Sequence, residues 1–131
     1  MSDYLADTSL FIAAETGRRL GTSPEGDSRV SVATLTELSL GVRRAPDEAT
    51  RRLRGTTLER ARQYIALPFD EAVAERLADI LAEARRLGRR AGAMDAIIAA
   101  TAVTHGLTVW TQDSDFYVLA ELAPSLLVHH G

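Results

Sequence analysis

Five acidic side chains have the types and spacing that could support hydrolytic chemistry: Asp7, Glu37, Asp95, Asp113 and Asp115. Asp95 is the most informative, because it is the single carboxylate in the apolar stretch AGAMDAIIAATAVTHG. A buried carboxylate is unfavourable by several kcal/mol unless it is paired, hydrogen-bonded or bound to a metal. Asp95 therefore either caps a helix or belongs to a functional site.

The segments that carry these acids alternate between strand and helix patterns. Short apolar or β-branched runs predict strands, and apolar residues with helical periodicity predict helices. The predicted strands are 3–6, 29–33, 65–69, 107–111 and 125–130, and the predicted helices are 9–20, 34–45, 47–64 with an interruption near Gly55, 70–88, 91–106 and 116–122. This alternation predicts an α/β fold in one domain over residues 1–131, a three-layer α/β/α sandwich with a parallel sheet of four or five strands.

Such a sheet would bring the acids to one edge. Ligands of parallel α/β proteins bind beyond the carboxyl ends of the strands. Asp7 ends the first predicted strand, and Asp113 and Asp115 directly follow the TVWT strand. Glu37 lies one helical turn after the second strand, and Asp95 begins the helix that leads into TVWT.

Taken one at a time, the acids also fit local structural roles. Asp7 fits a helix N-cap, and Glu37, the last residue of TLTE, fits a capping box. Asp95 would gain about 0.3–1 kcal/mol from the helix dipole, and the acids of QDSD are typical turn residues. Their predicted location at the same end of the sheet favours a shared site.

Convergence of these carboxylates would require a cation. Two carboxylates about 4 Å apart repel by roughly 4 kcal/mol at an effective dielectric constant near 20. The chain has no cysteine, and its three histidines lie near a helix end and in the C-terminal tail. An all-oxygen ligand set selects Mg²⁺ or Mn²⁺. Such a site can ionise water and stabilise the charge of an in-line displacement, which predicts phosphodiester hydrolysis.

Composition excludes several other classes. The chain has 131 residues and a formal net charge of −3, and 46% of its residues are hydrophobic. It lacks an apolar run long enough for a membrane span and a signal-peptide pattern, so we expect a soluble cytoplasmic protein. All 15 basic residues are arginine. The absence of lysine argues against Walker-type nucleotide sites, receiver domains and a phosphomonoesterase with Asp7 as its nucleophile.

Three stretches carry a family resemblance: LADTSLFIA, ATLTELSLGV and AMDAIIAATAVTHGLTVWTQDSDF. With the overall size, they resemble PIN-domain ribonucleases, specifically the VapC-type toxins of bacterial toxin–antitoxin pairs. Residues 47–66 match only in helical character. The resemblance implies that Asp7, Glu37, Asp95 and Asp113 hold the metal, that Asp115 is a fifth catalytic candidate, and that Thr8, Ser9 and Thr111 support the site through hydrogen bonds.

The function implied by the resemblance is a Mg²⁺- or Mn²⁺-dependent endoribonuclease, with arginines that hold the RNA backbone. Its expected partners are an RNA substrate, a small cognate VapB-type antitoxin and a second copy of the chain. An antitoxin arginine could pair with two acids of the site and compete with the metal. We expect Asp113 to face the site and Asp115 to cap the helix that follows, although either could be the fourth acid. A non-catalytic PIN-like scaffold that binds a partner is the main alternative.

Overall fold

The computed structural model describes residues 3–131, which form five strands and six helices. The strands are Tyr4–Ala6 (β1), Ser28–Ser31 (β2), Ile65–Leu67 (β3), Thr108–Thr111 (β4) and Leu127–His130 (β5). The helices are Thr8–Glu15 (α1), Val32–Arg43 (α2), Glu48–Ala61 (α3), Glu71–Arg86 (α4), Ala93–His105 (α5) and Asp115–Leu122 (α6).

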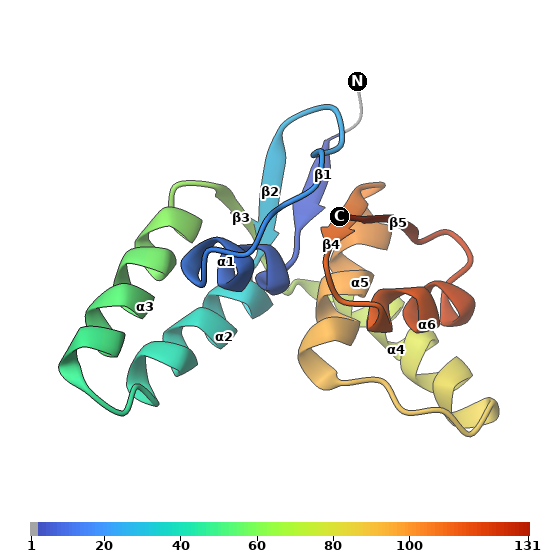
Figure 1. Cartoon of the computed structure of the whole chain (residues 1–131). Coiled ribbons are helices and arrows are strands. Elements are labelled where there is room, and N and C mark those ends of the chain that lie inside the picture. The colour runs from blue at the N-terminus through green and yellow to red at the C-terminus, as the bar shows by residue number, and fades with distance from the viewer. Residues whose placement is uncertain (1–2) are drawn as a thin grey trace.

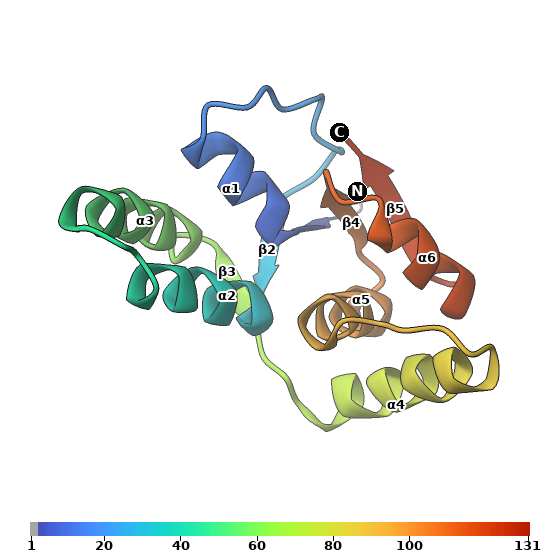
Figure 2. The same cartoon turned by 60° about the horizontal axis from the view of Figure 1, so that its bottom comes forward.

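The five strands form one parallel sheet in the order β3-β2-β1-β4-β5. Helix α1 lies on one side of the sheet, and α4, α5 and α6 pack together on the other side (Figures 1 and 2). Helices α2 and α3 form an antiparallel pair that packs against α1. The predicted α/β class and parallel sheet are confirmed, with five strands.

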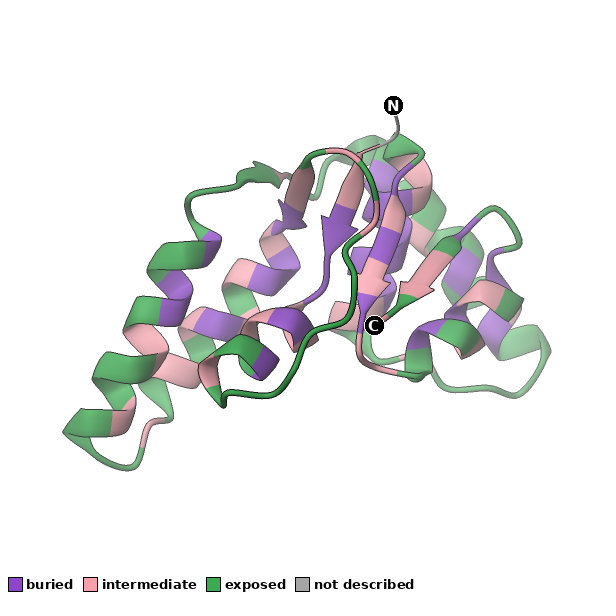
Figure 3. Cartoon of the chain, turned by 45° about the horizontal axis from the view of Figure 1, so that its top comes forward, coloured by how far each residue is buried: buried purple, intermediate pink, exposed green. Residues whose placement is uncertain are grey.

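The central strands and α5 are apolar because their side chains form much of the hydrophobic core. Leu5, Val30 and Val109 are fully buried in the three central strands. Figure 3 shows buried residues on the central strands and on the helices, whereas the edge strands β3 and β5 contain none. Helix α5 buries small and branched side chains between the sheet and α4. Within residues 3–131, no helix is both long and apolar enough to cross a membrane.

Helices α1 and α3 differ most from the sequence prediction. The predicted helix 9–20 ends at Glu15, because Gly17 adopts a left-handed conformation with φ +74°. The predicted interruption near Gly55 is wrong, since α3 continues through it from an N-cap at Asp47. A glycine inside a helix is unfavourable by about 1 kcal/mol relative to alanine, which packing of Leu58 and Ala61 against α2 and its neighbours can offset.

The sheet order creates a crevice between β1 and β4. The chain leaves β1 toward β2 on one side, whereas β4 lies on the other side of β1. The strands that follow β1 are thus added first on one side of it and then on the other, and the change of direction falls between β1 and β4. Parallel α/β sheets bind their ligands at such a reversal, and this is the edge at which the sequence predicts its acids to meet.

Candidate active site

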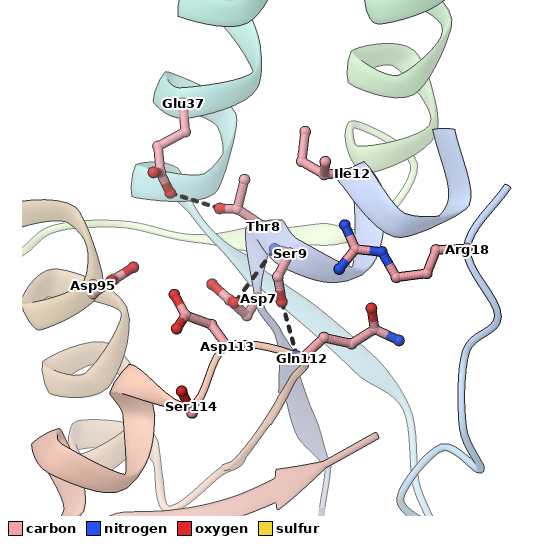
Figure 4. A pocket seen from close by; sticks show the side chains of 10 residues that line it. All are labelled: Asp7, Thr8, Ser9, Ile12, Arg18, Glu37, Asp95, Gln112, Asp113 and Ser114. Atoms are coloured by element: carbon pink, nitrogen blue, oxygen red, sulfur yellow. Dashed lines mark hydrogen bonds between the residues drawn. The ribbon is translucent and has the colours of Figure 1, made fainter. Parts of the chain in front are cut away.

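An open pocket of about 450 Å³ lies at this crevice. Four of the five predicted acids line it, namely Asp7, Glu37, Asp95 and Asp113. Figure 4 shows their carboxylates approaching one another from four separate segments, after β1, on α2, on α5 and after β4. The predicted convergence of these four residues is therefore present in the structure.

Asp7 occupies the deepest position, with 2% of its surface exposed. Its Oδ2 accepts a hydrogen bond from the Ser9 amide at 3.3 Å, so Asp7 is also the N-cap of α1. The same oxygen accepts a hydrogen bond from the Thr111 hydroxyl at 2.8 Å. Burial raises the pKa of Asp7, and the hydrogen bonds from Ser9 and Thr111 oppose that rise. The capping role and the site role therefore coexist in one side chain.

A chain of hydroxyl groups joins β4 to α1 beneath the pocket. Thr111 Oγ1 accepts from the Asp113 amide at 2.8 Å, and Ser9 Oγ accepts from the Gln112 amide at 2.9 Å. The two hydroxyls lie 3.2 Å apart. Because the Thr111 proton goes to Asp7, Ser9 must donate to Thr111. The predicted supporting roles of Ser9 and Thr111 have a defined geometry: they fix Asp7 and the backbone that carries Asp113.

Glu37 projects into the pocket from the second turn of α2. The N-cap of that helix is Ser31, so the capping-box interpretation of Glu37 is wrong. Instead, the Thr8 hydroxyl donates to Glu37 Oε1 at 2.6 Å and lies 3.1 Å from the hydroxyl of buried Thr34. Burial raises the pKa of Glu37, and the charges of Asp7 and Asp113 raise it further, whereas the bond from Thr8 lowers it.

Asp95 lies in the first turn of α5, where Gly92 is the N-cap and provides no side-chain cap. Its carboxylate is half-buried, and burial raises its pKa to about 7. The charges of Asp7, Asp113, Glu37 and Asp115 contribute in that order. Each of these causes raises the pKa of Asp95, and none of them lowers it. Asp95 is therefore held among like charges.

Of the two turn acids, Asp113 lines the pocket as predicted, whereas Asp115 does not have its predicted role. Helix α6 begins after an N-cap at Ser114 that makes no side-chain capping bond, and Asp115 is its first residue. The Asp115 amide instead donates to Asp113 Oδ1 at 2.9 Å. The prediction that Asp115 caps this helix is therefore wrong. Asp113 both supports the start of α6 and lines the pocket.

Asp115 remains close to the site although it is exposed. Asp95, Asp113 and Asp115 each offer an oxygen within 4.8 Å of the others, as a metal site would require. Asp115 lines a smaller neighbouring cavity with Asp95 rather than the main pocket. Asp95 thus belongs to this group with Asp113 and Asp115 and also lines the main pocket with Asp7 and Glu37.

The donor set fits a hard divalent cation. All the candidate ligands are carboxylates, and oxygen ligands select Mg²⁺ or Mn²⁺ over softer ions. The raised pKa values of Asp7, Glu37 and Asp95 indicate that burial and mutual repulsion disfavour the ionised forms. A bound cation would reverse this balance.

Sequence reasoning missed four residues that line the pocket: Ile12, Arg18, Gln112 and Ser114. Arg18 lies beyond the end of α1, where the sequence prediction extended the helix through residue 20. Gly17 was the available signal, because glycine commonly ends a helix in a left-handed conformation and turns the next residue back. Gln112 lies between two candidate residues, and its amide nitrogen donates to the carbonyls of Arg19 and Gly131.

Comparison with known proteins assigns this chain and its fold to a defined family. A profile of the PIN domain matches residues 4–122. Ribonuclease VapC4 of Mycobacterium tuberculosis is 41% identical over 121 residues, which cover 90% of this chain and 92% of that protein. Ribonuclease VapC8 of the same organism is 45% identical over 100 residues, 75% of this chain and 88% of that protein.

The similarity extends to three dimensions. The crystal structure of VapBC-5, a member of the VapBC family of toxin–antitoxin systems from Mycobacterium tuberculosis, matches with a TM-score of 0.85 and 32% sequence identity. The match covers 100% of both chains. The chain therefore belongs to the PIN domain family.

Proposed function

We propose that this protein is a Mg²⁺- or Mn²⁺-dependent endoribonuclease, the toxin of a toxin–antitoxin pair. The observation that carries the proposal is the convergence of four carboxylates in one pocket, with the pKa of Asp95 raised to about 7 by burial and by its acidic neighbours. A carboxylate cluster of this kind is unfavourable without a cation. The similarity to proteins named as VapC ribonucleases supports the reaction class.

The metal ligands we propose are Asp7, Glu37, Asp95 and Asp113. The alternative set replaces Asp7 and Glu37 by Asp115, whose oxygen lies within 4.8 Å of those of Asp95 and Asp113. We favour the first set because the charge of Asp7 raises the pKa of Asp95 most and that of Asp115 least. Asp115 then acts from the periphery, as a contributor to the negative potential or to RNA positioning.

The surrounding side chains would hold the acids in place during the reaction. Thr111 and Ser9 fix the buried Asp7 carboxylate, and Thr8 fixes Glu37, so the acids need not reorganise when a substrate arrives. A bound divalent ion would lower the pKa of a water molecule and stabilise the charge that develops on the phosphodiester. The carboxylates repel RNA, so arginines near the pocket must offset that repulsion.

The expected protein partner is a VapB-type antitoxin. A second cavity of about 400 Å³ adjoins the active pocket between α1, α2 and α3, and Ile12 and Glu37 line both. Leu38 and Leu40 make its wall partly apolar, which suits an amphipathic segment that folds as it binds. An arginine at the end of that segment could reach the carboxylates and pair with two of them. We also expect a homodimer, and action in the cytoplasm on RNA.

The direct test is cleavage of RNA by the purified protein. A second experiment maps the 5′ ends of RNA in cells after brief induction of the protein. We expect cleavage with Mg²⁺ or Mn²⁺, loss of cleavage in EDTA, and restoration when the metal is returned. An Asp7→Asn protein should be inactive under every condition. An Asp47→Asn protein is the matched control, because Asp47 caps α3 outside the pocket.

The outcomes separate the competing functions. Cleavage that persists in EDTA would remove the metal from the proposal and leave the ribonuclease. A protein that cleaves no RNA but binds the product of a neighbouring gene would favour the non-catalytic scaffold. Transfer of phosphate to Asp7 from a phosphomonoester would favour the phosphomonoesterase, a class for which the chain lacks the usual lysine.

A further inference from the structure

The residue that follows the C-terminal turn of α1 introduces a positive charge at an otherwise acidic pocket. Arg18 is the single basic residue among those that line the pocket, together with Asp7, Glu37, Asp95 and Asp113. Figure 4 shows its guanidinium extending from the segment after α1 toward the pocket, on the side of Ile12 and Gln112. The side chain is exposed and can therefore meet a ligand from solvent.

The backbone at Arg18 is fixed from both sides. The Arg18 amide donates to the Ala13 carbonyl at 2.8 Å and the Gly17 amide to the Ala14 carbonyl at 3.3 Å, which is the hydrogen-bond pattern of a Schellman motif. The next residue is held by Gln112, whose side-chain amide donates to the Arg19 carbonyl at 3.0 Å. Arg18 therefore projects from an anchored position, although its segment has no regular secondary structure.

The Arg18 guanidinium is not paired with a carboxylate within the described residues. Over residues 3–131, seven other arginines form salt bridges with carboxylates, and Arg18 forms none within 4.0 Å. Its charge is also absent from the causes that shift the pKa values of Asp7, Glu37 and Asp95. Arg18 thus faces the pocket without neutralising its acids, which leaves its donors available for an anion.

We infer that the Arg18 guanidinium binds a phosphate of the RNA backbone, and that this phosphate is next to the phosphodiester that is cleaved. This inference rests on the proposed ribonuclease function. A guanidinium presents its donors in a planar fork that matches phosphate oxygens. The carboxylates occupy the opposite side of the pocket (Figure 4), so the cleaved phosphodiester would lie among them while Arg18 holds a neighbouring phosphate. Arg18 is accordingly a substrate-binding residue rather than a metal ligand.

The test separates binding from catalysis. Cleavage of a fluorescein-labelled single-stranded RNA oligonucleotide in Mn²⁺ gives KM and kcat, and anisotropy with the same oligonucleotide in an Asp95→Asn background gives Kd. Arg18→Ala should raise KM and Kd about tenfold at low salt and leave kcat unchanged. The reason is that a phosphate contact made equally in the ground-state complex and in the transition state affects binding alone. The dependence of log Kd on log salt should fall by about 0.7 for the lost contact.

Two further variants make the test specific. Arg18→Lys keeps the charge and should restore the salt dependence while leaving KM above that of the wild type, because the fork is lost. Arg19→Ala is the matched control, since the Arg19 side chain is exposed and does not line the pocket; it should change neither constant. Thermal unfolding of each variant should match the wild type, because the anchoring bonds are made by the backbone and by Gln112.

An Arg18→Ala protein with wild-type KM, Kd and salt dependence would overturn the inference, as would a fall in kcat alone. Weakened antitoxin binding without any change in RNA binding would assign Arg18 to the protein partner and also overturn it. If the wild type cleaves no RNA, the proposed function fails. Arg18-dependent binding of the oligonucleotide would still support the phosphate contact in that case.

Discussion

Helices α4 and α5 pack against each other, and each has an aspartate at or near its N-terminus, yet the two aspartates differ in what they do. Asp70 is the exposed N-cap of α4, and its Oδ1 accepts from the Val73 amide at 3.0 Å. Asp95 lies inside the first turn of α5, makes no capping bond and is half-buried. One carboxylate completes its own helix, whereas the other is held in an unfavourable environment. An unfavourable environment that no local interaction explains makes Asp95 a candidate functional residue.

The largest expected effect is on catalysis at Asp95. Asp95→Asn keeps the shape and removes the charge, so we expect cleavage to fall by more than about a hundredfold, because even partners that only orient metal ligands contribute ten- to a hundredfold. Unfolding at neutral pH should show no loss of stability. Steady-state cleavage with Mn²⁺ and chemical denaturation of the same sample would check both. Full activity in this variant would remove Asp95 from the site.

The next comparison sharpens the roles of the two turn acids. Asp113→Ala should lose most activity and about 1 kcal/mol of stability, because Asp113 lines the pocket and also accepts from the Asp115 amide. Asp115→Ala should retain partial activity and near wild-type stability, since its side chain makes no capping bond for α6. Paired melting and cleavage measurements decide between the two acids. The reverse pattern would make Asp115 the fourth ligand.

The raised pKa of Asp95 predicts a pH-dependent stability in the metal-free protein. With a folded pKa of about 7 against an ordinary value of 3.8, the folded state binds more protons than the unfolded state between those values. Stability is then highest at low pH within this window and falls as the pH rises toward 7. Denaturation in EDTA between about pH 4 and pH 7 should show this fall, with a weaker fall in Asp95→Asn. Equal pH dependence in both proteins would contradict the assignment.

The smallest effect is expected at Asp70. Asp70→Ala removes the capping bond to Val73 and should lower the free energy of unfolding by about 1 kcal/mol. Cleavage should be unchanged, because Asp70 does not line the pocket. Chemical denaturation with parallel cleavage assays checks the pair of expectations. Loss of activity in a stably folded Asp70→Ala protein would contradict the expectation that Asp70 serves only as a helix cap.

Local patterns in the sequence were sufficient to predict most of the elements and the candidate acids. Alternating strand and helix patterns predict a parallel sheet, and the apolar run around Asp95 makes that carboxylate conspicuous from the amino-acid order alone. The Asp70 cap and the end of α4 near Gly88 also follow from local rules. These features are predictable because each depends on residues a few positions apart.

The interactions that those acids make depend instead on the packing of distant segments. Whether Glu37 caps a helix or meets Thr8 depends on where α2 begins, and that helix begins at Val32 rather than at Thr34. The Thr111 bond to Asp7 joins residues 104 positions apart, and the placement of Arg18 follows from a turn at Gly17 and an anchor at Gln112. A carboxylate's pKa and partners depend on side chains that only the packed sheet brings together, so local patterns could indicate the residues but not their environment.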